Sequence, residues 1–468
     1  MTTTSLRTRL PQRPRLPQPV VAAILSFLCP GLGQAYLRQT RWAAALGLPA
    51  IVLALYVGAQ LFGGVEVFAV QLLDPAFAVA VMVWTVIVGA LRLGSIGHVY
   101  LLATAAERAS RSVRGAVIGL LIAVVAMHGV IGYYAFAFYE AGSEIFVPAD
   151  EPGATDPPVA VATATPQPTP SLEPGVTASP EPTPRPPTNR ITFLLTGVDS
   201  GFDRNHALPD TLLAVSVDTV DKTAVMLSLP RDLSRLPMYS GGTYNDKINS
   251  LLTTARLNPS KYPDGPMGTL TREIGFLIGI QIDYYAQINL EGFEKMVNLV
   301  GGIDVNNPKW INDPAYDWFD GTYGFTLSPG KHHLNGRVAL AYVRTRQGAG
   351  DNDFTRARRQ QQVIGALRVK MTSPAMLQKL PDILKVAAKT IKTDFPADQI
   401  NEIVALGKEI PNDQINQGIV LGPPYAYRPA TSTGTYYLLL DMAKIAKLST
   451  QVFGTDSNYY GQDTSAAP

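Results

Sequence analysis

The stretch LAYVRTRQGAGDNDFTRARRQQQVIGALRVK runs from Leu340 to Lys370 and decides the fold. Residues 339–345, which include its first part, alternate in polarity, and this alternation predicts a β-strand. On such a strand the side chains of Arg344 and Arg346 point the same way. Gly and Asp residues then indicate a turn, after which the pattern changes to that of a helix.

The helical period begins at Phe354. At about 100° per residue, Arg356 and Arg359 share one face with Gln360, and Arg358 points away from that face. Because arginine stays charged, an inward-facing cluster of these and the two preceding arginines requires an anionic partner. The planar guanidinium group suits phosphate oxygens. Residue types alone leave two interpretations open, an anion-binding site or structural ion pairs with neighbouring Asp residues.

Length and composition exclude several classes of protein. A chain of 468 residues is too long for one ordinary domain. The single cysteine, Cys29, excludes an intramolecular disulfide and makes a cysteine-based zinc site untenable. The net charge of +2 is unevenly placed, because the first 114 residues contain ten arginines and no lysine.

Residues 1–140 are expected to form a membrane region. Three apolar runs, 42–63, 67–89 and 116–138, are each long enough to span a bilayer as a helix. A fourth run, 20–36, is interrupted by Pro-Gly and is expected to be interfacial or re-entrant. The region therefore has three full transmembrane helices and one segment that does not cross.

Arginine positions predict the orientation of this region. With three crossings, the arginines of 7–15, 38–41 and 92–114 all lie on the cytoplasmic side, as the positive-inside rule requires. Four crossings would place one of these groups outside. The sequence therefore predicts a multi-pass protein of the cell membrane whose chain beyond Phe138 is extracellular.

The rest of the chain divides by composition. Residues 141–189 are expected to be a disordered extracellular stalk, because thirteen prolines lie between 148 and 187. Residues 190–455 have the pattern of an α/β domain, with a mixed central sheet flanked by helices, and 456–468 are expected to be a disordered tail. The fold class is therefore α/β, preceded by an all-α membrane region.

A predicted hairpin brings candidate site residues together. Strands over 211–217 and 223–229 flank a short turn, and antiparallel pairing then places Asp210 near Arg231 and Asp232. Two carboxylates can hold Mg²⁺, and the arginine beside them suits a pyrophosphate. The alternative is that the two carboxylates are a turn residue and a helix cap.

Six segments occur in an order that resembles a known family: LPDTLLAVSVD, LSLPRDL, DKINS, INLEGFEKMVNLVGGIDV, LNGRVALAYVRTR and DFTRARRQQQVI. They resemble the LytR–CpsA–Psr family of cell-wall glycopolymer ligases, with the motifs in 190–371 and further helices in 373–453. The resemblance implies a Mg²⁺-dependent, phosphotransferase-type enzyme. Such an enzyme transfers an anionic glycopolymer from an undecaprenyl-pyrophosphate-linked donor to peptidoglycan or a related wall glycan, forming a phosphodiester.

The resemblance also assigns roles to residues. It implies that Asp210 and Asp232 bind Mg²⁺. It implies that pyrophosphate is bound by Arg231, Arg344, Arg346 and Arg356. The family's K-I-N and R-Q-Q segments correspond to Lys247, Asn249, Arg359 and Gln360.

Three further expectations accompany these roles. Leu208 stands where the family usually has an arginine, and Arg204 is the candidate substitute. Asp353 is the candidate acceptor for the proton of the acceptor hydroxyl. A hydrophobic pocket should hold the lipid, and 247–252 and 276–282 are candidates to line it, with the protein core as their alternative place.

Two other functions remain open at this point. A lipid pyrophosphatase would use the same site with water as the acceptor. A non-catalytic cell-envelope regulatory or binding protein would keep the membrane anchor. No nucleic-acid partner is expected, because the arginines face inward rather than forming a surface stripe.

Overall fold

The computed structural model divides into two compact units, Met1–Tyr139 and Glu140–Pro468, which are considered separately. The structure describes residues 16–62, 64–146, 189–198, 208–318, 320–371, 373, 376, 379–429 and 436–461. Most of the expected stalk, and Arg204, lie outside these residues.

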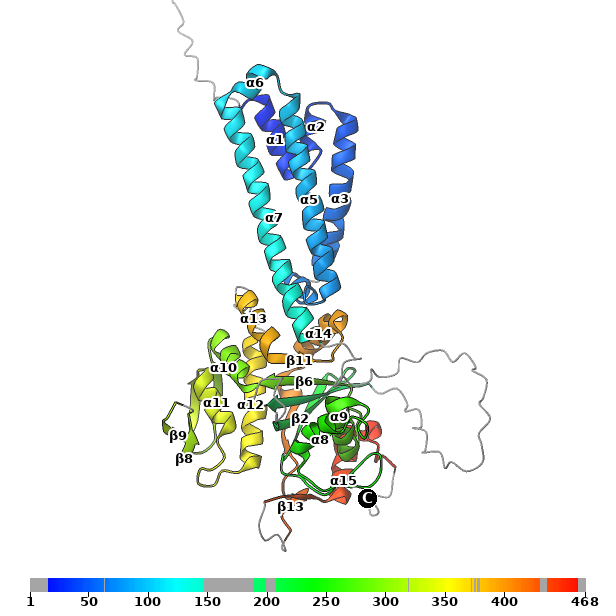
Figure 1. Ribbon diagram of the computed structural model, residues 1–468, viewed down its shortest axis with the longest axis vertical. Coiled ribbons are helices and arrows are strands. Elements are labelled where there is room, and N and C mark those ends of the chain that lie inside the picture. The colour runs from blue at the N-terminus through cyan, green and yellow to red at the C-terminus, as the bar shows by residue number, and fades with distance from the viewer. Residues whose placement is uncertain are drawn as a thin grey trace, which may run out of the picture. The chain divides into compact units, whose positions relative to one another are not determined.

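The first unit is all helical (Figure 1). By length and composition alone, three of its helices can cross a membrane: α3 (Thr40–Leu61), α5 (Pro75–Leu102) and α7 (Arg111–Ile145). The others are α1 (Gln18–Leu28), α2 (Leu32–Tyr36), α4 (Val65–Gln71) and α6 (Ala105–Ala109). The second long helix begins later than the expected 67–89, because Asp74 caps it by accepting from the Ala76 amide and Pro75 occupies its first position.

The segment 20–36 is broken at the expected place. Helix α1 has 11 residues, too few to span a bilayer, and Gly31 then adopts a positive φ of 90°. The turn is held against α5, since the Gln34 amide donates to the Ser95 carbonyl at 2.9 Å and accepts from the Ser95 hydroxyl at 2.9 Å. Both side chains are fully buried.

The second unit is built on a six-stranded mixed sheet of order β11-β6-β1-β2-β3-β12. The pairs β1–β6 and β3–β12 are parallel, and the other neighbours are antiparallel. The strands are β1 (Arg190–Val198), β2 (Pro209–Asp218), β3 (Thr223–Leu229), β6 (Tyr284–Asn289), β11 (Ile391–Thr393) and β12 (Ile415–Val420). The predicted mixed sheet and the β2–β3 hairpin, in which Asp218 pairs with Thr223, are confirmed.

Alternate residues of the strands serve two different helical layers. Leu194 faces a core that includes α8 (Leu251–Leu257), α9 (Gly265–Ile278) and α15 (Met442–Phe453). Leu195 instead lines a cavity to which α10, α11 and α12 contribute. These helices are α10 (Leu290–Leu299), α11 (Gly336–Arg344) and α12 (Asp353–Met371). Two more helices, α13 (Leu380–Thr390) and α14 (Ile400–Glu409), follow in the chain. Figure 1 shows α8 and α9 well separated from α10 and α11, with the sheet between them.

Short elements complete the unit. Small two-stranded sheets pair β4 with β5, β7 with β10, β8 with β9 and β13 with β14. Their bounds are β4 (Leu236–Pro237), β5 (Thr243–Tyr244), β7 (Ile303–Asn307), β8 (Ile311–Asp317), β9 (Tyr323–Leu327), β10 (Gly330–Leu334), β13 (Ala426–Tyr427) and β14 (Leu439–Leu440). Single 3-10 turns occupy Ile248–Ser250, Ala397–Gln399, Asn412–Gln414 and Gly454–Asp456.

The strand expected over 339–345 was wrong, because these residues belong to helix α11 and the turn that follows it. Asn335 caps the helix by accepting from the Val338 amide at 3.0 Å, and Tyr342 is then fully buried. A short run of alternating residues does not distinguish the period of a strand from that of a helix. Here the capping residue Asn335 indicates the helix.

Two other expectations need correction. Residues 456–461 were assigned to a disordered tail, but Tyr459 is buried and its hydroxyl donates to the Phe276 carbonyl at 3.2 Å. The segments 247–252 and 276–282 supply core residues such as Leu252 and Ile278 and do not line the cavity. The apolar character of these segments therefore reflects the core, which was the stated alternative.

Candidate functional site

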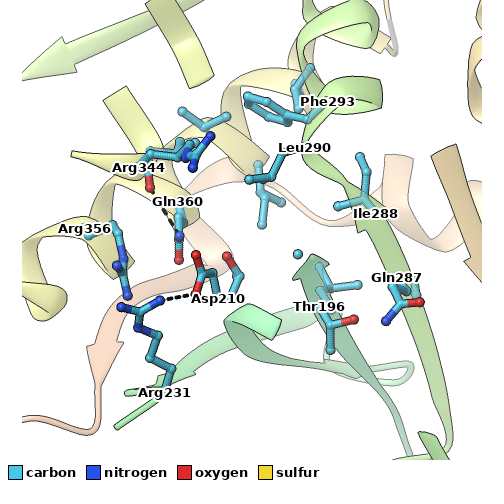
Figure 2. A pocket seen from close by; sticks show the side chains of 18 of the residues that line it. Thr196, Asp210, Arg231, Gln287, Ile288, Leu290, Phe293, Arg344, Arg356 and Gln360 are labelled. Atoms are coloured by element: carbon cyan, nitrogen blue, oxygen red, sulfur yellow. Dashed lines mark hydrogen bonds and ion pairs between the residues drawn. The ribbon is translucent and has the colours of Figure 1, made fainter. Parts of the chain in front are cut away.

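Helices α11 and α12 bring the predicted arginines to one cavity. Arg344 ends α11, Arg346 follows it in the connecting turn, and Arg356 lies in the first turns of α12. All three line the cavity, together with Asp210 and Arg231 from the hairpin (Figure 2). The predicted convergence is therefore present, although a helix end rather than strand alternation produces it.

The hairpin supplies the most connected part of the site. The Arg231 guanidinium contacts a carboxylate oxygen of Asp210, and its Nε lies 3.8 Å from Asp232 Oδ2. The ammonium group of Lys247 contacts the other oxygen of Asp232. Burial alone would lower the pKa of Arg231, but the carboxylates of Asp210, Asp232 and Asp353 together raise it above its ordinary value.

A third carboxylate, that of Asp353, lies beside two arginines of the cavity wall. Asp353 Oδ1 lies 2.9 Å from Arg356 Nη2 and 3.6 Å from Arg346 Nη1. Arg356 is 6% exposed, and burial lowers its pKa despite the neighbouring Asp353. Its Nε is buried and has no hydrogen-bond partner within the described residues, which leaves a donor for a bound anion.

The remaining candidates hold the site in shape. Arg359 Nη1 lies 2.8 Å from Asp351 Oδ2, and the same guanidinium donates to the Thr345 carbonyl and lies over the Tyr342 ring. Arg359 therefore forms structural ion pairs and does not line the cavity. Gln360 lines the cavity, and its side-chain amide donates to the Val343 carbonyl at 3.3 Å.

Lys247 and Asn249 contact the end of the β2–β3 hairpin. The Asn249 amide N–H donates to the Arg231 carbonyl at 3.4 Å, and the Asn249 side chain is buried. Lys247 neutralises Asp232, as described above. Leu208 is 41% exposed before β2 and does not line the cavity, and Arg204 lies outside the described residues.

The cavity has a volume of about 350 Å³ and two chemically different ends. Figure 2 shows Asp210, Arg231 and Arg356 on one side and Leu290 and Phe293 on the other. The apolar lining comprises Leu195, Ile288, Leu290, Phe293, Val343, Val363, Ile364, Leu367 and Ile391. An amphiphile with an anionic head and a hydrocarbon tail therefore matches both ends.

Sequence reasoning missed Tyr436. The Leu438 amide donates to the Asp232 carbonyl at 3.0 Å, which attaches this segment directly behind the hairpin end. Burial raises the pKa of Tyr436, and the carboxylates of Asp353 and Asp232 raise it further. Arg428 lies over the Tyr436 ring at 5.5 Å. The position of Tyr436 follows from the parallel pairing of Leu438 with Leu233, which only the tertiary structure shows.

The carboxylates of the site are too few to hold a metal ion without ligands from water or substrate. Among the described residues, no group of three or more acidic, His or Cys side chains is arranged for a metal ion. Mg²⁺ commonly uses one or two carboxylates and completes its shell with water and substrate phosphates. Asp210 and Asp232 are the two carboxylates that could serve in this way, and they lie close together because both are near the Arg231 guanidinium.

Comparison with known proteins defines the class to which the chain belongs. A family model described as the LytR_cpsA_psr family matches residues 167–453, more than half of the chain. The protein therefore belongs to the LytR–CpsA–Psr family.

Individual relatives are similar over the same part of the chain. A polyisoprenyl-teichoic acid–peptidoglycan teichoic acid transferase, TagU of Bacillus licheniformis, is 31% identical over 216 residues, which are 46% of this chain and 63% of TagU. Biofilm regulatory protein A of Streptococcus mutans is 31% identical over 208 residues, 43% of this chain and 49% of that protein. The chain thus spans less than two thirds of the length of either relative. The crystal structure of Bacillus subtilis TagV is 25% identical, covers 57% of this chain and 97% of its own, and has a TM-score of 0.44.

Proposed function

We propose that the domain transfers an anionic glycopolymer from a polyprenyl-pyrophosphate-linked donor to peptidoglycan or a related wall glycan. The observation that supports this most directly is the single cavity with an arginine-lined end and an apolar end. The arginines match the pyrophosphate, and the apolar side chains match the first part of the lipid tail. The family's teichoic acid transferases, such as TagU, provide the precedent.

The reaction balances as a displacement at phosphorus. The acceptor hydroxyl oxygen forms a bond to the phosphorus that carries the glycopolymer, and the bond from this phosphorus to the bridging oxygen breaks. The polyprenyl monophosphate leaves with the bridging oxygen. Arg231, Arg346 and Arg356 stabilise the negative charge that develops on this leaving group.

Asp353 would take the proton of the acceptor hydroxyl. Its carboxylate lies between Arg346 and Arg356 at the polar end of the cavity. Mg²⁺ bound by Asp210 and Asp232 would supply further charge neutralisation at the pyrophosphate. Lys247, whose ammonium group contacts Asp232, would orient this carboxylate for that role.

The acceptor is expected to approach from the side of Tyr436. In a displacement at phosphorus the nucleophile enters opposite the leaving group, whose lipid chain would occupy the apolar end of the cavity. Tyr436 does not line that cavity, but its segment is joined to the hairpin end by the hydrogen bond from the Leu438 amide to the Asp232 carbonyl. Its ring and Arg428 are suited to stack on and hydrogen-bond a sugar.

Membrane anchoring by the three long apolar helices is part of the proposal. The arginines of the first unit favour a cytoplasmic position for its loops, which would place the second unit outside the cell. There the enzyme would meet both a lipid-linked donor in the outer leaflet and the wall glycan.

A transfer assay separates this proposal from hydrolysis at the same site. The full chain in nanodiscs would be incubated with radiolabelled polyprenyl-pyrophosphate glycopolymer, with and without oligomeric peptidoglycan. We expect label on the glycan, retained after lipid extraction, and dependence on Mg²⁺. Label released as free phosphorylated polymer, at the same rate with and without glycan, would instead identify a pyrophosphatase.

A further inference from the structure

The membrane unit contains an arginine deep in its apolar part. Arg92 belongs to α5 and lies between two aromatic pairs, Trp42–His98 with ring centres 4.6 Å apart and Tyr56–Trp84 at 4.4 Å. At 1.5 Å per residue, Arg92 is about 9 Å from His98 and about 12 Å from Trp84 along the helix. Helix α5 continues from Arg92 to Leu102, so Arg92 lies within this apolar helix and not in the flanking loop where the arginine positions had predicted it.

The charge of Arg92 has no compensating acid among the described residues. Its Nη1 donates only to the Met127 sulfur, a weak acceptor, at 3.7 Å. Its Nε is buried and makes no hydrogen bond within the described part of the chain. An intramembrane arginine in such surroundings is costly, and arginines of this kind commonly mark a binding site or pathway.

A cavity of about 620 Å³ lies beside this side chain. It is lined by Arg92, by Cys29 and Pro30 of the α1–α2 turn, and by Met127 and His128 of α7. Apart from Arg92, His128 and Thr85, the lining side chains are apolar, aromatic or sulfur-containing, and no carboxylate is among them. The cavity therefore joins one uncompensated positive charge to a hydrocarbon-like wall.

One part of the wall, the α1–α2 turn, is held in place by hydrogen bonds. The buried Gln34–Ser95 hydrogen bonds hold the α1–α2 turn, and the Gly31 amide also donates to the Ser95 hydroxyl at 3.2 Å. This network fixes the position of Pro30, which lines the cavity, against the same helix that carries Arg92.

We propose that this cavity binds the phosphate headgroup of a lipid, with Arg92 as its charge partner. The phosphate would accept hydrogen bonds from the guanidinium, and the apolar wall would contact the first carbons of the lipid chain. A polyprenyl monophosphate and a phosphatidylglycerol share this chemistry. The site shares no residue with the cavity of the second unit and does not depend on the function proposed for it.

Lipid binding to the full chain tests the proposal. Delipidated protein in detergent would be titrated with polyprenyl monophosphate, phosphatidylglycerol or uncharged polyprenol, and bound lipid counted by native mass spectrometry. We expect Arg92→Gln to weaken binding of a phosphate lipid about ten- to hundredfold. Arg114→Gln, which changes an exposed arginine of the same unit, should leave it unchanged.

The titrations would be repeated in an Arg356→Gln background, because a polyprenyl phosphate also fits the cavity of the second unit. The proposal is supported if a phosphate lipid still binds in this background and no longer binds when Arg92→Gln is added. The affinities for polyprenyl monophosphate and phosphatidylglycerol then show which of the two lipids the site prefers. Binding unaffected by Arg92→Gln, or polyprenol binding as tightly as the phosphate lipids, would overturn it. If Arg92→Gln does not fold, Arg92→Lys takes its place and should bind phosphate lipids with an affinity between those of the wild type and an uncharged site. The melting temperature of the wild-type protein gives a further check. If polyprenol raised it as much as the two phosphate lipids do, the site would be refuted.

Discussion

Two arginines separated by one residue have opposite environments in α12. Arg356 is buried at the polar end of the cavity, whereas Arg358 is exposed on the other side of the helix. A charge-assisted hydrogen bond to phosphate contributes about 1.5–3 kcal/mol, so Arg356→Gln should weaken donor binding about ten- to hundredfold. Isothermal titration of the full chain in nanodiscs with a polyprenyl-pyrophosphate ligand measures this change.

Arg358→Gln is the matched control and should bind donor normally. Arg356→Lys should recover only part of the affinity, because an ammonium group cannot bind two oxygens in a planar fork. If Arg356→Gln bound donor as tightly as the control but melted at a lower temperature, Arg356 would serve structure alone.

Asp210 and Asp232 should behave as one functional unit. Both contact Arg231, and the proposed cation would require both. We therefore expect Asp210→Asn and Asp232→Asn each to abolish Mg²⁺-dependent turnover, and the double variant to be little worse than either single one. Losses that add in free energy would show that the two carboxylates act separately.

At the scale of elements, the wall of the cavity depends on close packing between α10 and α13. A Cβ added at Gly292 would lie 1.9 Å from Thr390 Cγ2 at the end of α13. Gly292→Ala should therefore lower the free energy of unfolding by about 1–3 kcal/mol, because one of the two helices must shift. The melting temperature of the purified protein, read from the second unit's near-ultraviolet circular dichroism, measures the effect.

Gly407 of α14 offers the comparison for this change. A Cβ there meets no atom within 4 Å, so Gly407→Ala should raise stability by about 0.5–1 kcal/mol through helix propensity alone. Equal effects of the two substitutions would mean that the α10–α13 contact does not constrain the fold.

At the scale of the whole molecule, the proposed topology predicts protease sensitivity. Protease added to intact spheroplasts should remove the second unit, because the chain beyond α7 is expected to be outside. A tag at the N-terminus should survive until the membrane is permeabilised. Cleavage of the second unit only after permeabilisation would require the opposite orientation.

The position of Arg38 tests the number of crossings. In a Cys29→Ala background, Arg38→Cys should react with a membrane-permeant thiol reagent and resist an impermeant one added from outside. Reaction with the impermeant reagent would mean that residues 20–36 cross fully.

Much of this protein follows from local sequence. The β2–β3 hairpin was predictable because a short turn fixes antiparallel register, and that register alone brings Asp210 beside Arg231. The opposite placement of Arg356 and Arg358 followed from helical period. Both inferences depend on residues that are close in the chain.

Tertiary structure decided the rest. Residues 339–345 could not be assigned by alternation, because a buried helix turn and a strand share that pattern over so few residues. The role of Arg359 depended on Asp351 and the Thr345 carbonyl, which a turn brings to it. The cavity's apolar wall and Tyr436 come from segments that are far apart in the chain, from Leu195 to Tyr436. Sequence periodicity shows which residues are buried but not which distant segments they meet.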